Sequence, residues 1–199
     1  MSTTVARSGD SLRSTIQSGG TVDVIVDAAG AEAGSIFLQG DLQATRLVLS
    51  AADASSRIIF EDNIAGAGHA GSGAALEATA GDHVRFRGNT GDWVFDSATF
   101  TGTPLVRFDA DSTGITASGG SLDFNPAGDA GTSIQIDNAT AFAFGGTTNL
   151  SSGIDSAGDL TFSDAVVITG SGVEIDAPSV TFDSLLDSEG AEGNGLTLT

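Results

Sequence analysis

Short triplets with apolar outer residues recur along this chain at a nearly constant spacing. They occupy positions 58–60, 84–86, 106–108, 122–124, 142–144, 160–162, 180–182 and 196–198. Their last residues are 26, 22, 16, 20, 18, 20 and 16 positions apart, which averages close to 20. A second series, with apolar residues at 115, 134–136, 154 and 173–175, steps by 19, 20 and 19. Two interleaved series with one period of this size indicate a solenoid.

The triplets themselves predict short β-strands. Their outer residues are apolar and the middle one is usually polar, which is typical of a strand with one buried face. Turn-forming residues separate them, for example at 119–120, 137–138 and 170–172. The sequence therefore predicts an all-β parallel β-helix of about 20 residues per coil. A β-sandwich of short antiparallel strands would explain the alternation equally well, but it would not explain the common period.

The two ends of the chain differ. Residues 8–20 predict a short N-terminal helix, with Asp10 as N-cap, Leu12 and Ile16 on one face, and Gly19 and Gly20 as the stop. Such a helix would cap the open end of the solenoid, so we expect a cap over 1–20 and a solenoid over 21–199. Residues 195–199 stop inside a core strand, from which we expect truncation of a longer solenoid. The alternative is a natural end that is covered by a partner or frayed.

Composition excludes several classes of protein. The seven basic residues, all arginine, face 26 acids, so the net charge is −19 and nucleic-acid binding is excluded. The absence of cysteine removes disulfides, thiolate catalysis and cysteine-ligated metals. There is no apolar run long enough for a membrane-spanning helix, and the first ten residues lack the apolar segment of a signal peptide. The charge is uneven: residues 1–107 carry 7 − 12 = −5, whereas residues 108–199 carry 0 − 14 = −14.

Particular motifs in the middle of the chain carry a family resemblance. Phe60 and Asn63 form a Phe-x-x-Asn unit, as do Phe86 and Asn89, and Gly-Ser-Gly-Ala-Ala-Leu lies between them at 71–76. Residues 57–95 therefore resemble repeats in bacterial autotransporter and polymorphic outer-membrane adhesin passengers. The later repeats, at 156–162 and 172–177, are more similar to filamentous-haemagglutinin-type adhesins. The resemblance implies a right-handed β-helix exposed on the bacterial cell surface. We expect Asn63 and Asn89 to be corner residues that hydrogen-bond the backbone of neighbouring coils.

Catalysis would require clustered carboxylates on one outer face. The middle residues of the triplets should point outward and stack as one column: Arg85, Arg107, Asp123, Ala143, Thr161, Thr181 and Thr197. In this column Arg107 would pair with Asp123, and no two carboxylates would be adjacent. The second series places a single acid outward, Glu174. We therefore expect no catalytic site.

Other candidate sites are also weak. His69 and His83 lack the spacing of a zinc site, so no metal site is expected. Trp93 is expected to be buried or half-buried in a strand rather than to form an exposed sugar-stacking platform. Asp residues at coil corners (109 and 111, 155 and 159, 183 and 187) favour only weak, diffuse divalent-cation binding, with no cofactor. The row Thr161, Thr181, Thr197 resembles the flat threonine rows of ice-binding solenoids, but threonine is also a common strand residue.

Together these features predict a non-enzymatic structural and adhesive rod, part of a large secreted bacterial surface protein. It would be extracellular and monomeric, with a receptor or polysaccharide on a host or neighbouring cell as its partner and an unassigned binding site. One alternative is a carbohydrate-active β-helix enzyme or a tail-spike-like polysaccharide-binding protein. Another is a halophilic extracellular protein, because an acidic surface without lysine suits high salt.

Overall fold

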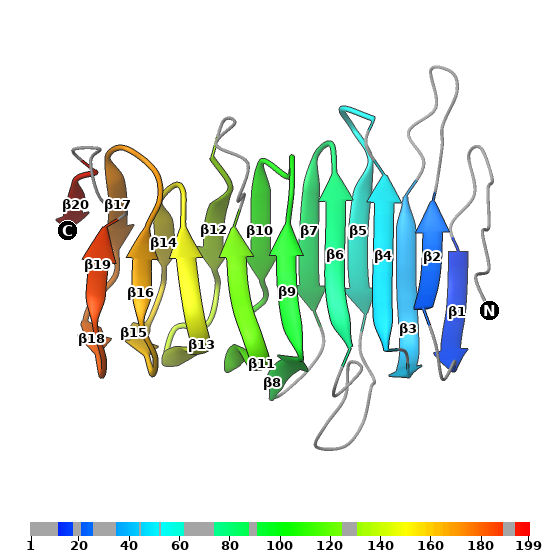
Figure 1. The fold of residues 1–199 in the computed structure, drawn as a ribbon, viewed down its shortest axis with the longest axis horizontal. Helices are drawn as coiled ribbons and strands as arrows, with labels where there is room; N and C mark the ends of the chain where they lie inside the picture. Colours follow the sequence, from blue (N-terminus) through cyan, green and yellow to red (C-terminus); the bar gives the residue numbers. More distant parts are fainter. Residues whose placement is uncertain are drawn as a thin grey trace.

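The chain forms a parallel β-solenoid of about 22 residues per turn, so the predicted fold class is confirmed. The computed structural model describes residues 12–17, 21–25, 35–43, 45–51, 53–61, 74–87, 91–124, 131–188 and 194–199. Figure 1 shows these residues as strands that follow one another along a single rod. They include no helix long and apolar enough to cross a membrane.

Two parallel sheets run along the rod. Sheet A has nine strands, in the order β1 (Leu12–Gln17), β3 (Ile36–Gln43), β5 (Arg57–Glu61), β7 (His83–Arg87), β10 (Leu105–Phe108), β12 (Ser133–Ile136), β14 (Ile154–Ser156), β17 (Val173–Asp176) and β20 (Leu196–Leu198). Sheet B has eleven: β2 (Thr21–Ile25), β4 (Arg46–Ala51), β6 (Ala75–Ala80), β8 (Asp92–Phe95), β9 (Ser97–Phe100), β11 (Gly114–Phe124), β13 (Ala141–Leu150), β15 (Asp159–Phe162), β16 (Val166–Ile168), β18 (Val180–Phe182) and β19 (Leu186–Ser188).

The coils wind with a right-handed sense. In Figure 1 strands β2, β4, β6, β9, β16 and β19 of sheet B run upward in front, the strands of sheet A run downward behind, and the chain advances from right to left. This is the hand that connections between parallel strands almost always adopt, because twisted strands pack back onto their own sheet only in that way.

The cross-section changes along the rod, because sheet B divides into two faces from β8 onward. The first part of β11 pairs with β8, and its last part pairs with β9. β13 repeats this arrangement, pairing with β15 and then with β16. Its bend contains Gly146, which has a φ of +88° and would place a Cβ 2.5 Å from the carbonyl oxygen of Ala117. A side chain at this position would therefore be both strained and obstructed.

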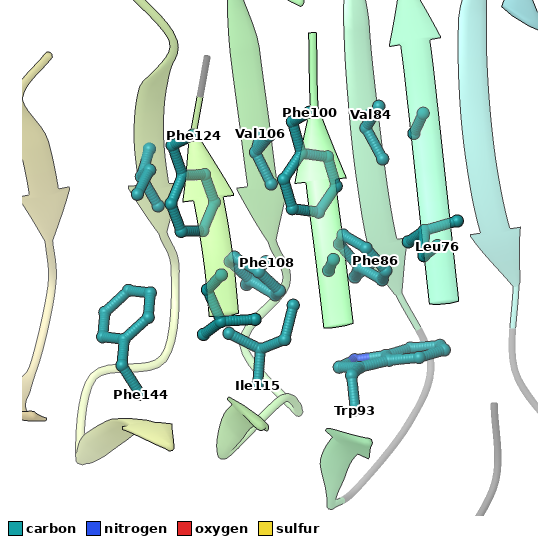
Figure 2. Packing of buried hydrophobic residues seen from close by; sticks show 14 of the residues in the cluster. Leu76, Val84, Phe86, Trp93, Phe100, Val106, Phe108, Ile115, Phe124 and Phe144 are labelled. Atoms are coloured by element: carbon teal, nitrogen blue, oxygen red, sulfur yellow. The ribbon is translucent and has the colours of Figure 1, made fainter. Parts of the chain in front are cut away.

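Stacked aromatic rings fill the interior. Phe60, Phe86 and Phe108 occupy the same position on β5, β7 and β10. Their successive ring centroids are 4.7 and 4.9 Å apart, with the planes inclined by 8° in both pairs. These distances match the spacing of adjacent strands, so in-register pairing places each ring on the next. Figure 2 shows how apolar side chains from the two facing sheets pack against one another in the interior.

The predicted N-terminal helix is wrong. Residues Leu12–Gln17 are strand β1, which pairs in parallel with β3. Leu12 and Ile16 are four residues apart, a spacing that fits a helix face but also fits one face of a strand. The segment is too short for a stable helix by itself, and pairing with β3 offers it backbone hydrogen bonds along one edge. The expected N-cap and stop, Asp10 and Gly19–Gly20, lie outside the described residues.

The predicted single outward column is also wrong, because successive triplets do not all lie on one side of the rod. Arg85 and Arg107 are neighbours in sheet A, as predicted. Asp123, however, lies on β11 in sheet B, between Thr99 and Asn149. The row Ala143, Thr161, Thr181 does exist in sheet B, but Thr197 lies in sheet A beside Glu174. The mixture of faces also explains why the sequence spacing averaged 20 residues rather than about 22 per turn.

We expect the cost of shortening a stacked phenylalanine to depend on its place along the rod. Phe86→Ala should lower the free energy of unfolding by about 3–5 kcal/mol, because this ring is fully buried and stacked on both sides. Phe182→Ala is the matched control, because this ring is half-buried and, among the described residues, stacks only on Phe162. It should cost only about 1 kcal/mol. Urea denaturation followed by circular dichroism measures both, and equal losses would contradict the stacking argument.

Candidate functional site

The outer face of sheet A carries charged side chains on several neighbouring strands. One outward row contains Ile59, Arg85, Arg107, Gln135, Asp155 and Asp176, one from each of six consecutive strands. The row is basic at β7 and β10 and acidic at β14 and β17. These two parts make different contacts.

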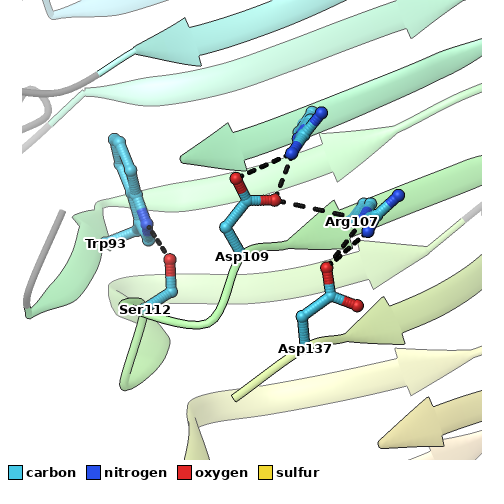
Figure 3. Close-up of polar contacts among 6 residues, drawn as sticks. Trp93, Arg107, Asp109, Ser112 and Asp137 are labelled. Carbon is cyan, nitrogen blue, oxygen red and sulfur yellow. Dashed lines mark hydrogen bonds and ion pairs between the residues drawn. The ribbon is translucent and has the colours of Figure 1, made fainter. Parts of the chain in front are cut away.

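In the basic part, each arginine reaches diagonally to an aspartate on the next coil. Arg85 donates through Nε and Nη2 to the two carboxylate oxygens of Asp109, both at 2.9 Å. Arg107 donates to Asp137 at 2.9 and 2.6 Å, and its Nε lies 3.9 Å from Asp109. Figure 3 shows the four side chains as one continuous ladder, which we call the Arg–Asp ladder.

The Arg–Asp ladder is partly shielded from water, which makes it stronger than an ordinary surface pair. The side chains of Arg85 and Asp109 are 31% and 20% exposed. The hydrogen bond to Asp109 raises the pKa of Arg85, outweighing the opposing effect of burial. The sequence had predicted that Arg107 pairs with Asp123. In the structure Arg107 pairs with Asp137 instead, because Asp137 directly follows β12, the strand that lies beside β10.

A buried polar corner lies beside the ladder. Trp93 is fully buried on β8 and donates its indole N–H to the hydroxyl of Ser112 at 3.1 Å, as Figure 3 shows. Asn138 donates to the carbonyl of Ser112 at 2.8 Å and accepts from the backbone N–H of Thr140 at 2.8 Å. The burial predicted for Trp93 is confirmed. Asn138 plays the corner role that we expected of Asn63 and Asn89, which lie outside the described residues.

In the acidic part, three carboxylates line an open depression of about 330 Å³. Asp155 and Asp176 are in-register neighbours on β14 and β17, and Glu174 lies two residues before Asp176 on the same face. All three are exposed. The sequence spacing did not predict the Asp155–Asp176 pair, because the 19-residue step places Ile154 opposite Val173, whereas Ile154 pairs with Ile175.

A second depression, of about 510 Å³, lies where sheet A turns into the lower part of sheet B. Its lining includes Asp111 and Thr140, which are exposed, and Ala143 and Thr161 from the outward row of sheet B. It gathers one carboxylate and a few hydroxyl groups, which is too little for acid–base chemistry.

The described residues contain no group of three or more His, Cys, Asp or Glu side chains arranged to hold a metal ion. His83 lies at the start of β7, with its Nδ1 3.1 Å from Asp82, and His69 lies outside the described residues. Of the corner aspartates suggested for weak cation binding, Asp109 is already bound by Arg85. Asp111 is exposed and lies in the same turn, which the backbone N–H of Ser112 closes by donating to the carbonyl of Asp109.

No protein-family model matches the chain, and searches of curated proteins and of solved structures likewise return no significant match. What the structure establishes is therefore the parallel β-solenoid.

We expect the ladder to stabilise the rod more than a fully exposed pair does. A double-mutant cycle with Arg85→Gln and Asp109→Asn should give a coupling energy of about 1 kcal/mol. The control cycle uses Arg46→Gln and Glu77→Gln, because that pair has the same two-bond geometry but is 49% and 44% exposed. Its coupling should stay below about 0.5 kcal/mol. Urea denaturation of the wild type and the six variants measures both cycles, and the reverse order would refute the role of burial.

Proposed function

We propose that this chain is a non-enzymatic segment of the rod of a secreted bacterial surface protein, and that it acts in adhesion. The observation that carries the proposal is that charged side chains on the outer surface pair with one another between coils. The best-formed side-chain ion pairs, Arg46–Glu77, Arg85–Asp109 and Arg107–Asp137, each join one coil to the next. They reinforce the rod by joining successive coils.

The mechanism would be geometric. Adjacent coils are separated by about 4.8 Å, so the nine strands of sheet A extend over about 38 Å. Both sheets are continuous and the interior is filled, which makes such a rod stiff. A stiff rod holds binding features at a fixed distance from its attachment point, and its repeated outer rows can present the same side chains several times along one line.

Sequence features support the extracellular setting. The chain has no cysteine and a net charge of −19, which suit an exposed, soluble surface. The Phe-x-x-Asn units and the later repeats resemble those of autotransporter-type and filamentous-haemagglutinin-type adhesins. The right-handed parallel solenoid agrees with that resemblance. The partner would be a receptor or polysaccharide on a host or neighbouring cell, and a monomeric rod would bind it.

One observation favours the second candidate, a polysaccharide-cleaving enzyme. Asp155 and Asp176 are in-register neighbours, and adjacent strands are about 4.8 Å apart, close to the carboxylate separation in retaining glycosidases. A general acid also needs an environment that disfavours its charged form. Asp155, Glu174 and Asp176 are all exposed in an open depression, which does not provide one.

The test separates binding from turnover. The full chain, displayed in many copies on beads, should be retained by bacterial or host cell surfaces or by immobilised polysaccharide, without releasing sugar fragments. Retention should be lost after heat unfolding, because it depends on the folded surface. If beads are retained by none of these surfaces, adhesion is wrong.

Turnover would instead support the enzyme. New reducing ends or unsaturated sugars that disappear in Asp155→Asn or Asp176→Asn would overturn the proposal. Asp53→Asn is the control for these variants, because it removes one exposed carboxylate far from the depression.

A further inference from the structure

The depression of about 510 Å³ at the corner between sheet A and the lower part of sheet B is lined by groups that neither the Arg–Asp ladder nor the carboxylates of β14 and β17 use. Its volume lies within the range of about 300–1,000 Å³ that is typical of small-molecule sites. Three consecutive coils contribute to it, through the turn after β10, the turn before β13 with the start of β13, and β15. The alanines of the lining are Ala110, Ala141 and Ala143, and its polar side chains are Asp111, Thr113, Asn138, Thr140 and Thr161.

Asn138 brings a buried hydrogen-bond donor to this depression, because it belongs to the lining and is only 7% exposed. Its Oδ1 accepts from the backbone N–H groups of Thr140 and Ala141 at 2.8 and 3.2 Å. Its Nδ2 donates to the carbonyl of Ser112 at 2.8 Å, which uses one of the two N–H groups of the amide. The second N–H has no partner among the described residues. A buried donor is normally matched by an acceptor, and an oxygen atom of a bound molecule can supply it here.

The remaining polar groups of the lining offer both acceptors and donors. Asp111 is exposed, and its carboxylate accepts hydrogen bonds without donating any. Thr140 is exposed and Thr161 is half-buried, and each hydroxyl can donate and accept. Thr113 donates to Oδ1 of Asp92 at 2.8 Å, which leaves its own oxygen as an acceptor. The depression therefore combines one oriented donor, one carboxylate and three hydroxyl groups with the methyl groups of alanines.

We propose that this depression binds one unit of an uncharged polysaccharide. A sugar unit carries hydroxyl groups, which both donate and accept hydrogen bonds, and C–H groups, which pack against apolar side chains. Asn138 donates to a sugar oxygen, Asp111 accepts from a sugar hydroxyl, and the alanine methyl groups contact the ring. Because the backbone of its own corner holds the amide of Asn138, this donor is oriented before the sugar binds, which lowers the entropic cost of binding.

The charge of the site favours a sugar without acidic groups. Among the residues of the lining, Asp111 is the one with an ionisable side chain, and the chain as a whole has a net charge of −19. A uronate or sulfate group would therefore meet like charge, which opposes binding, whereas a neutral sugar does not. The inference rests on the proposed adhesive function, for which it names the class of partner and the place where it binds.

Affinity electrophoresis of the full chain tests the site. Native gels that contain dextran, mannan or galactan are compared with a gel that contains polygalacturonate and with a gel without polysaccharide. At least one of the neutral polysaccharides should retard the chain, and polygalacturonate should not. Ala143→Gln should abolish the retardation, because this outward residue of β13 lines the depression and a longer side chain fills it. Asp111→Ala should weaken the affinity about tenfold, because it removes a hydrogen bond to a charged group.

The matched controls are Thr99→Gln, at an outward position of β9, and Asp53→Ala, which removes an exposed acid from another coil. Both should migrate with the wild-type retardation. Retardation that survives Ala143→Gln and Asp111→Ala, or that the controls lose equally, overturns this site but leaves adhesion standing. Retardation by polygalacturonate alone overturns the uncharged class of partner. If none of the polysaccharides retards the chain, the inference is overturned, whereas the adhesive function is then decided by the retention of beads on cell surfaces.

Discussion

The in-register parallel pairing of one coil with the next is the constraint on which the rest of this structure depends. It places equivalent side chains about 4.8 Å apart in continuous rows, inside and outside. Inside the rod this is favourable, because phenylalanine rings stack on phenylalanine rings and exclude water. On the outer surface the same register places like charges side by side, and two parts of the chain differ in whether opposite charges compensate them.

Where arginine stacks on arginine, the conflict is resolved within the fold. Arg85 and Arg107 are direct neighbours in sheet A, yet each extends to an aspartate that follows the neighbouring strand on the next coil. The diagonal contact turns a repulsive row into a ladder of alternating charge. Where aspartate stacks on aspartate, at Asp155 and Asp176, no basic side chain follows in the sequence to do the same.

The period of the triplets was sufficient to predict the solenoid, because only stacked coils explain such a spacing. It was insufficient to predict which triplets share a face. Phe108 and Phe124 are 16 residues apart but lie in different sheets, since β11 and β13 each bend across two faces and contribute two apolar segments. The predicted Arg107–Asp123 pair and the predicted threonine row to Thr197 were wrong for this reason, because each joined residues that lie in different sheets. The acidic pair was missed for a related reason, a two-residue difference in register at β17.

The local pattern at the N-terminus could not decide between a helix and a strand, because Leu12 and Ile16 satisfy both periods. Long-range pairing with β3 decided it. Each coil likewise contacts only its neighbours. Favourable contacts in one part of the rod therefore do not stabilise coils several turns away. The rod is therefore best described as a sequence of interfaces of unequal strength. Those with the Arg–Asp ladder are joined by side-chain ion pairs, whereas the interfaces beyond β13 have none, because no basic residue follows Arg107 in the sequence.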